Sequence, residues 1–202
     1  MYSVPMALVD FLPVLFFAAA SVLLQRDLYN KMSKGVFALF AAGTIDVILA
    51  GFLKALYKLL YAAGVCDFQP LTQMFFPVQA IGFLLAGLAM LRVKAGKKQT
   101  AALSVAAVPV FKGTFIFVGL MVLGLGAMDL GLCRLALRKK KPLACLLFAV
   151  SFVFCLGMGY LASKDFTKSY LNWAAELVNI IGQGSLLWGV LLLHRAGLGE
   201  ND

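Results

Sequence analysis

The chain has 202 residues, of which 62% are hydrophobic and 13% charged, and its mean hydropathy is +0.93. Soluble domains carry about 25% charged residues, so this composition excludes an ordinary soluble domain and predicts that residues 1–202 form one integral membrane domain in a lipid bilayer. The net charge of +9 does not indicate nucleic-acid binding, because the basic residues lie in short clusters between hydrophobic runs, as the positive-inside rule expects.

Five membrane-spanning helices are readily placed, because a hydrocarbon core of about 30 Å needs roughly 20 helical residues. They are expected at about residues 7–25, 36–61, 71–91, 142–162 and 171–193. The N-terminal run has no basic residues ahead of its apolar stretch, so we interpret it as a retained first span and not as a signal peptide.

The segment from Thr100 to Cys133 is too long for one straight span and barely long enough for two. A double crossing keeps the basic clusters Arg26–Lys34, Arg92–Lys98 and Arg134–Lys141 on one side, whereas a single crossing separates the last cluster from the others. The sequence therefore predicts an all-α bundle of seven spans in the plasma membrane, with the N-terminus outside and the C-terminus cytoplasmic. Six spans plus a re-entrant segment near residues 99–111 is the alternative.

The two halves of the chain share a weak similarity. Asp67-Phe68 and Asp165-Phe166 occupy corresponding places after a span, and each half begins with a span, a basic loop and a hairpin partner. This pattern predicts a 3+1+3 arrangement, with repeat 1 at about 1–95, a linker helix at about 99–111 and repeat 2 at about 113–197. Chance similarity among apolar helices is the alternative interpretation.

That arrangement resembles the group of sugar exporters of the SWEET type, nicotinamide riboside transporters and PQ-loop proteins. The resemblance covers the topology and no diagnostic motif: Pro77-Val78-Gln79 is not a proline–glutamine pair, and the WxxW pattern of the riboside transporters is absent. The resemblance implies transport and assigns no residue roles.

Polar residues inside the spans need a reason, because an ionisable group at mid-membrane costs roughly 2.5–3.5 kcal/mol on insertion scales. Residues at helical spacing place several of them on shared faces. We expect them to line a polar cavity that opens outward, with Asp46 at its floor and Lys54 able to pair with Glu176; the lining residues are Asp46, Lys54, Gln79, Glu176, Asn179 and Gln183.

A purely structural role for these residues is the alternative. In that interpretation Lys54 and Lys58 extend toward the membrane surface, Asp46 pairs with a lysine or with hydroxyl groups of neighbouring helices, and the amides hold helices together. Near the inner end of its span, Asp129 is expected to form a local ion pair with Arg134.

No metal or cofactor is expected. The four cysteines form no CxxC pair, and the single histidine, His194, lies at the end of the last span, far from all of them. The chain also contains no GxSxG or HExxH motif, so no catalytic residues are predicted, although a carboxylate pair of Asp46 and Glu176 leaves an intramembrane enzyme acting on lipid-like substrates open.

These observations together favour a small-solute transporter or its substrate-binding membrane subunit. A membrane sensor or partner-binding subunit and an intramembrane enzyme are the alternatives. The expected partners are the lipid bilayer, a small-molecule solute, and a second copy of the chain or another membrane protein.

Overall fold

The computed structural model describes residues 3–93, 114–161 and 169–200, and every element of regular structure in these ranges is an α-helix. The helices are α1 (Val4–Val9), α2 (Phe11–Leu28), α3 (Lys34–Ala62), α4 (Pro70–Gln73), α5 (Phe75–Leu91), α6 (Thr114–Arg138), α7 (Pro142–Leu161) and α8 (Ser169–Arg195). In the described part, six helical stretches are long and apolar enough to cross a membrane, with α1–α2 and α4–α5 each forming one stretch. This architecture is compatible with a multi-pass membrane protein; the linker helix expected at about 99–111 lies outside the described residues.

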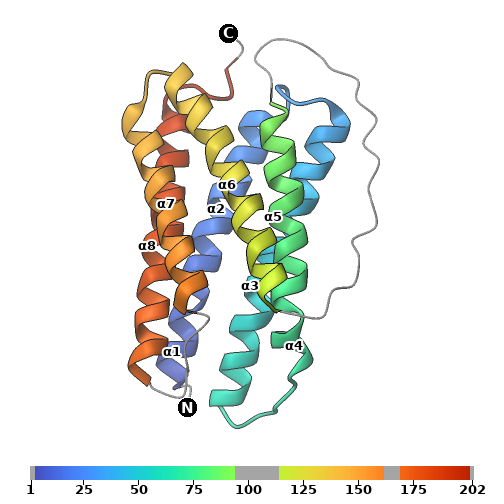
Figure 1. Ribbon diagram of the computed structural model, residues 1–202, viewed down its shortest axis with the longest axis vertical. Helices are drawn as coiled ribbons and strands as arrows, with labels where there is room; N and C mark the ends of the chain where they lie inside the picture. Colours follow the sequence, from blue (N-terminus) through green and yellow to red (C-terminus); the bar gives the residue numbers. More distant parts are fainter. Residues whose placement is uncertain (1–2, 94–113, 162–168, 201–202) are drawn as a thin grey trace.

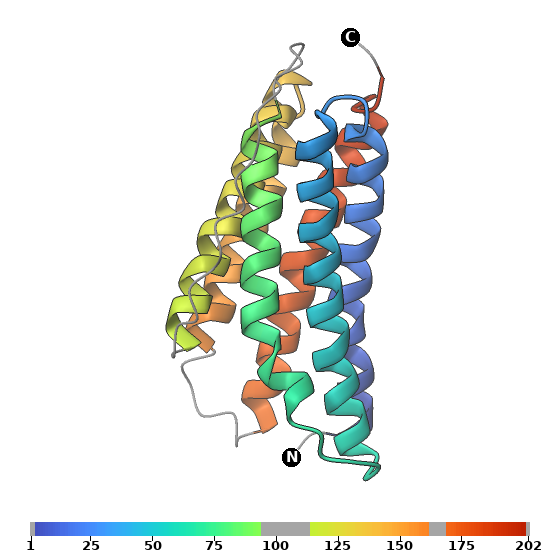
Figure 2. The same ribbon diagram turned by 90° about the vertical axis from the view of Figure 1, so that its right-hand side faces the viewer.

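Two prolines explain why the first and third stretches are each divided into a short and a long helix. Pro13 has no N–H to donate to the carbonyl group of Val9, and the division between α1 and α2 falls at Asp10. In the same way Pro77 cannot donate to the carbonyl group of Gln73, where α4 ends. Both divisions therefore lie three residues before a proline, at the same end of the bundle (Figures 1 and 2).

The six long helices form a closed ring, which we call the helix ring. Each packs mainly against two neighbours, in the order α2, α3, α5, α6, α7, α8 and back to α2. All six run close to the long axis of the molecule (Figure 1). A ring of this kind can enclose a central space, because no helix occupies its middle.

Helices α5 and α6 run in the same direction. Gly124 of α6 lies against Phe83, whereas Gly131, further along α6, lies against Met90, further along α5. The two backbones are so close at Gly124 that a Cβ there would overlap with the backbone of Phe83. Consequently α5 ends at one end of the bundle and α6 begins at the other (Figure 1).

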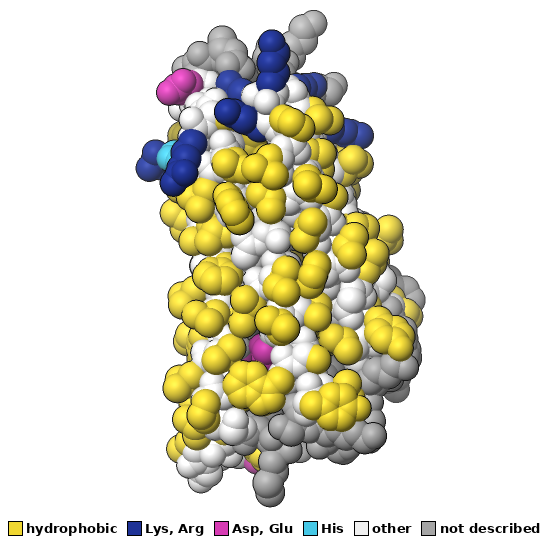
Figure 3. Space-filling view, turned by 90° about the vertical axis from the view of Figure 1, so that its left-hand side faces the viewer, with side chains coloured by type: hydrophobic (Ala, Val, Ile, Leu, Met, Phe, Trp, Pro, Cys, Tyr) yellow, Lys and Arg dark blue, Asp and Glu magenta, His cyan; other side chains and the backbone are white. Residues whose placement is uncertain are grey.

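Charge is distributed unevenly along the bundle. Every described Lys and Arg except Lys54 and Lys58 lies at the end where α2, α5, α6 and α8 finish and where α3 and α7 begin, which we call the basic end. Figure 3 shows these side chains gathered at one end of the molecule, above a broad apolar surface. They are Arg26, Lys31, Lys34, Arg92, Arg134, Arg138, Lys139, Lys140, Lys141 and Arg195.

Candidate functional site

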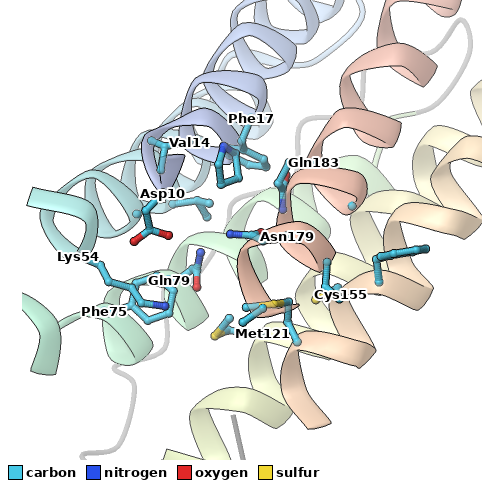
Figure 4. Close-up of a pocket in the computed structure, with 18 of the residues that line it drawn as sticks. Asp10, Val14, Phe17, Lys54, Phe75, Gln79, Met121, Cys155, Asn179 and Gln183 are labelled. Atoms are coloured by element: carbon cyan, nitrogen blue, oxygen red, sulfur yellow. The ribbon is translucent and has the colours of Figure 1, made fainter. Parts of the chain in front are cut away.

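A cavity of about 320 Å³ lies inside the helix ring, in the half of the bundle away from the basic end. All six long helices contribute to it, each with residues near its end opposite the basic end. Most of the wall is apolar, and its aromatic and methionine side chains are Phe17, Phe75, Phe76, Phe83, Met121, Phe154 and Met158. Figure 4 shows several lining side chains directed toward a common space.

The cavity is closed toward the basic end. Phe17 and Phe83 line it and are 3% and 2% exposed, and beyond them the interior of the helix ring is filled by buried apolar side chains. These include Leu24, Leu28, Phe40, Met90, Leu125, Met128, Leu132, Phe148, Leu186 and Leu193. A molecule in the cavity therefore has no passage to the basic end in this conformation.

Three buried ionisable side chains meet at the opposite end of the cavity. The Nζ atom of Lys58 lies 2.8 Å from Oδ2 of Asp10 and 2.7 Å from Oε1 of Glu176. The three residues are only 4–7% exposed. They lie about 6–10 Å from the ends of their helical stretches, at the rise of about 1.5 Å per residue. Lys58 thus links α3 to α8 and to the break between α1 and α2.

Lys54 completes this cluster of charges. Its Nζ atom lies 4.0 Å from the centroid of the Phe75 aromatic ring, a cation–π arrangement. With Lys58, Asp10 and Glu176, the cavity contains two basic and two acidic side chains, so its formal charge is balanced. Oε2 of Glu176 is buried and has no hydrogen-bond partner in the described part of the chain.

Four carboxamide side chains line the same cavity: Gln79 comes from α5, and Asn172, Asn179 and Gln183 come from α8. Figure 4 shows Gln79, Asn179 and Gln183. The Oε1 atoms of Gln79 and Gln183 are buried without a hydrogen-bond partner among the described residues. A buried polar group left without a partner costs about 1–3 kcal/mol, so these amides are suited to hydrogen bonding with a molecule that enters the cavity.

The structure brings together five of the six residues that the sequence singles out: Lys54, Gln79, Glu176, Asn179 and Gln183 all line the cavity. Asp46 is half-buried, packs against Gly82 of α5 and is not among the described lining residues. The physical reason is helical drift. The step of eight positions from Asp46 to Lys54 turns the helix by about 80° beyond two full turns, so the two side chains point in different directions.

Two of the ion pairs predicted from the sequence are not found in the structure, so these predictions are wrong. Glu176 pairs with Lys58 and not with Lys54, whose ammonium group lies over Phe75 instead. Asp129 does not pair with Arg134, because both of its carboxylate oxygens are buried without a hydrogen-bond partner in the described ranges. Asp129 and Arg134 are five positions apart on one helix, so their side chains point in directions that differ by about 140°.

Sequence reasoning missed two charged residues of the site, Asp10 and Lys58. Asp10 carries a detectable signal, since an acidic side chain inside the first apolar run is costly without a partner. Lys58 carries a weaker one, because a long lysine side chain near a helix end can reach the membrane surface. Only the three-dimensional arrangement shows that these two side chains form an ion pair.

Comparison with known proteins adds no assignment: no family model, no curated protein and no solved structure matches the chain. Within the described residues, no group of three or more His, Cys, Asp or Glu side chains is arranged to hold a metal ion. The site is therefore interpreted from its own geometry. It is a cavity closed at one end, with apolar walls, a charge-balanced cluster and two amide oxygens that have no partner in the described part of the chain, which is an arrangement suited to binding a small molecule.

Proposed function

We propose that this protein is a small-solute transporter, or the substrate-binding membrane subunit of one, in the plasma membrane. The observation that carries the proposal is the cavity of about 320 Å³ that all six long helices line. Pockets for small molecules are typically about 300–1,000 Å³, so the volume suits a small solute. Closure at one end by packed side chains is what a transporter requires, because a passage open at both ends would leak.

Two observations support seven spans with the cavity facing outward. Helices α5 and α6 run in the same direction, so if both cross the membrane, the chain between Val93 and Thr114 must cross it as well. The basic end corresponds to the cytoplasmic side under the positive-inside rule. The N-terminus and the cavity then lie on the outer side, and the C-terminus is cytoplasmic.

The directions of the helices support the 3+1+3 arrangement. α2, α3 and α5 run toward, away from and toward the basic end, and α6, α7 and α8 repeat this order (Figures 1 and 2). The two sets occupy opposite halves of the helix ring. A half-turn about the long axis would therefore place α2 on α6, α3 on α7 and α5 on α8, which is the relation expected of a parallel repeat.

Side-specific labelling tests the orientation. Cys66 is an exposed natural thiol between α3 and α4, away from the basic end. In sealed cells it should react with a membrane-impermeant maleimide. Cysteine introduced at Lys141, an exposed position between α6 and α7, should react only after permeabilisation when Cys66 is replaced by alanine. Labelling of this Cys66→Ala, Lys141→Cys variant in intact cells would contradict the proposed orientation.

Uptake by proteoliposomes tests the function itself. Purified protein should accumulate at least one component of a mixed pool of small metabolites above the level of protein-free vesicles. Gln183→Leu, which removes an amide from the cavity, should reduce that uptake, whereas Gln73→Leu at an exposed position of α4 should not. Uptake equal to that of empty vesicles across the pool would contradict transport, and solute binding without uptake would favour the binding subunit.

A further inference from the structure

We infer that the cavity selects an uncharged, amphipathic molecule: one that carries an amide-like hydrogen-bonding group on an apolar, ring-sized body. The inference rests on the proposed function in that it takes the cavity as a solute site. It goes further by naming the chemistry of the solute, which follows from charge balance, from the amide side chains and from the wall of the cavity.

Charge balance argues against a charged ligand. Lys58 is already held between Asp10 and Glu176 at 2.8 Å and 2.7 Å, and Lys54 lies over Phe75. An anion or a cation entering the cavity would add an uncompensated charge to a balanced and largely buried set. Burying such a charge is costly unless a counter-charge pairs with it.

The amides argue for a ligand that both donates and accepts hydrogen bonds. A carboxamide offers two N–H donors and one carbonyl acceptor. Gln79 and Gln183 face the cavity from α5 and α8, and each has a buried oxygen without a partner in the described part. Asn179 stands between them in Figure 4. An amide, lactam or urea group on the ligand would match this set, since it presents complementary donors and acceptors.

The wall of the cavity argues for an apolar body on the same molecule. Phe76 and Phe154 line it with aromatic rings, and Met121 and Met158 add flexible thioether side chains. Aromatic faces stack on planar rings, and methionine adapts its shape to them. A highly hydroxylated ligand would leave several polar groups unmatched against this surface, so the wall disfavours it.

Three probes of one shape and different charge test the inference. Phenylacetamide, phenylacetate and phenethylammonium share an aromatic ring and differ at the group that would meet the amides. In titration calorimetry on the full-length protein in nanodiscs, phenylacetamide should bind at least about tenfold more tightly than either ion. Equal or tighter binding of phenylacetate or phenethylammonium would overturn the inference, and so would failure of all three to bind at millimolar concentration.

Two substitutions at one position sharpen the test. Gln183→Leu should weaken phenylacetamide binding about five- to tenfold, because one net hydrogen bond is lost, while Gln73→Leu should leave it unchanged. Gln183→Glu should reverse the preference toward phenethylammonium, because it adds an unbalanced negative charge. An unchanged order of preference in a folded Gln183→Glu variant would show that the ligand charge is selected elsewhere and would count against the inference.

The outcomes separate this inference from the proposed function. Selective binding of phenylacetamide in a protein that moves no solute would support the solute chemistry and contradict transport. Uptake confined to charged solutes would support transport and contradict the solute chemistry. Thermal melting of each variant, with Gln73→Leu as reference, identifies any that fails to fold.

Discussion

Phe17 of α2 and Phe83 of α5 contact each other edge to face inside the helix ring, with ring centroids 5.7 Å apart and an interplanar angle of 74°. Their helices are not neighbours in that ring. Both side chains line the cavity and are buried. The pair therefore separates the cavity from the packed core and links two helices that α3 separates in the ring.

A double-mutant cycle on this pair measures that link. Phe17→Ala and Phe83→Ala should each destabilise the protein by about 3–5 kcal/mol, because each removes a large buried side chain. Their coupling energy should be about 0.5–1.5 kcal/mol, as for other edge-to-face pairs. Denaturant titrations in detergent measure both quantities. Strictly additive effects would contradict a direct contact at the floor of the cavity.

The buried charge cluster predicts unequal roles for two lysines four residues apart. Lys58→Met leaves Asp10 and Glu176 buried without their cation and should cost about 3–5 kcal/mol of unfolding free energy. Lys54→Met loses a cation–π contact and should cost about 0.5–2 kcal/mol. Combining Lys58→Met with Asp10→Asn and Glu176→Gln should recover most of the loss in melting experiments. A triple variant no more stable than Lys58→Met would argue that the cluster is not an electrostatic unit.

Two buried aspartates should respond in opposite ways to the same substitution. Asp129 has no hydrogen-bond partner among the described residues, so Asp129→Leu should stabilise the fold by about 1–3 kcal/mol. Asp27 lies 2.9 Å from Nδ1 of His194, and Asp27→Leu should lower stability because it removes that contact between α2 and α8. Melting temperatures compare the two. A marked loss of stability in Asp129→Leu would reveal a partner for that carboxylate.

The close contact of α5 with α6 depends on the glycine at position 124, which has no side chain. A Cβ at Gly124 would overlap with the backbone of Phe83, so Gly124→Ala should force the helices apart and destabilise the bundle. Gly119 on the same helix has nothing within 4 Å of its would-be Cβ, and Gly119→Ala should be neutral or stabilising by up to about 1 kcal/mol. Equal melting temperatures for the two variants would contradict the close packing of α5 and α6 at Gly124.

The helices were largely predictable from the sequence, and the contacts between them were not. Apolar runs of the right length placed spans at about 36–61 and 142–162, close to the helices Lys34–Ala62 and Pro142–Leu161, because lipid exposure requires such runs. The pairing of Lys58 could not be predicted, since its partners lie on helices whose order around the ring depends on packing. Asp46 shows the same limit: a shared face at i, i+4 drifts away over two turns.

Accessibility of the cavity is the measurement that tests the central claim most directly. In a background with Cys66, Cys133, Cys145 and Cys155 replaced by alanine, Asn179→Cys places one thiol on the cavity wall. An impermeant thiosulfonate should label it from the side opposite the basic end and not from the basic end, and phenylacetamide should slow the reaction. Labelling from neither side, or only from the basic end, would contradict a solute cavity that opens outward.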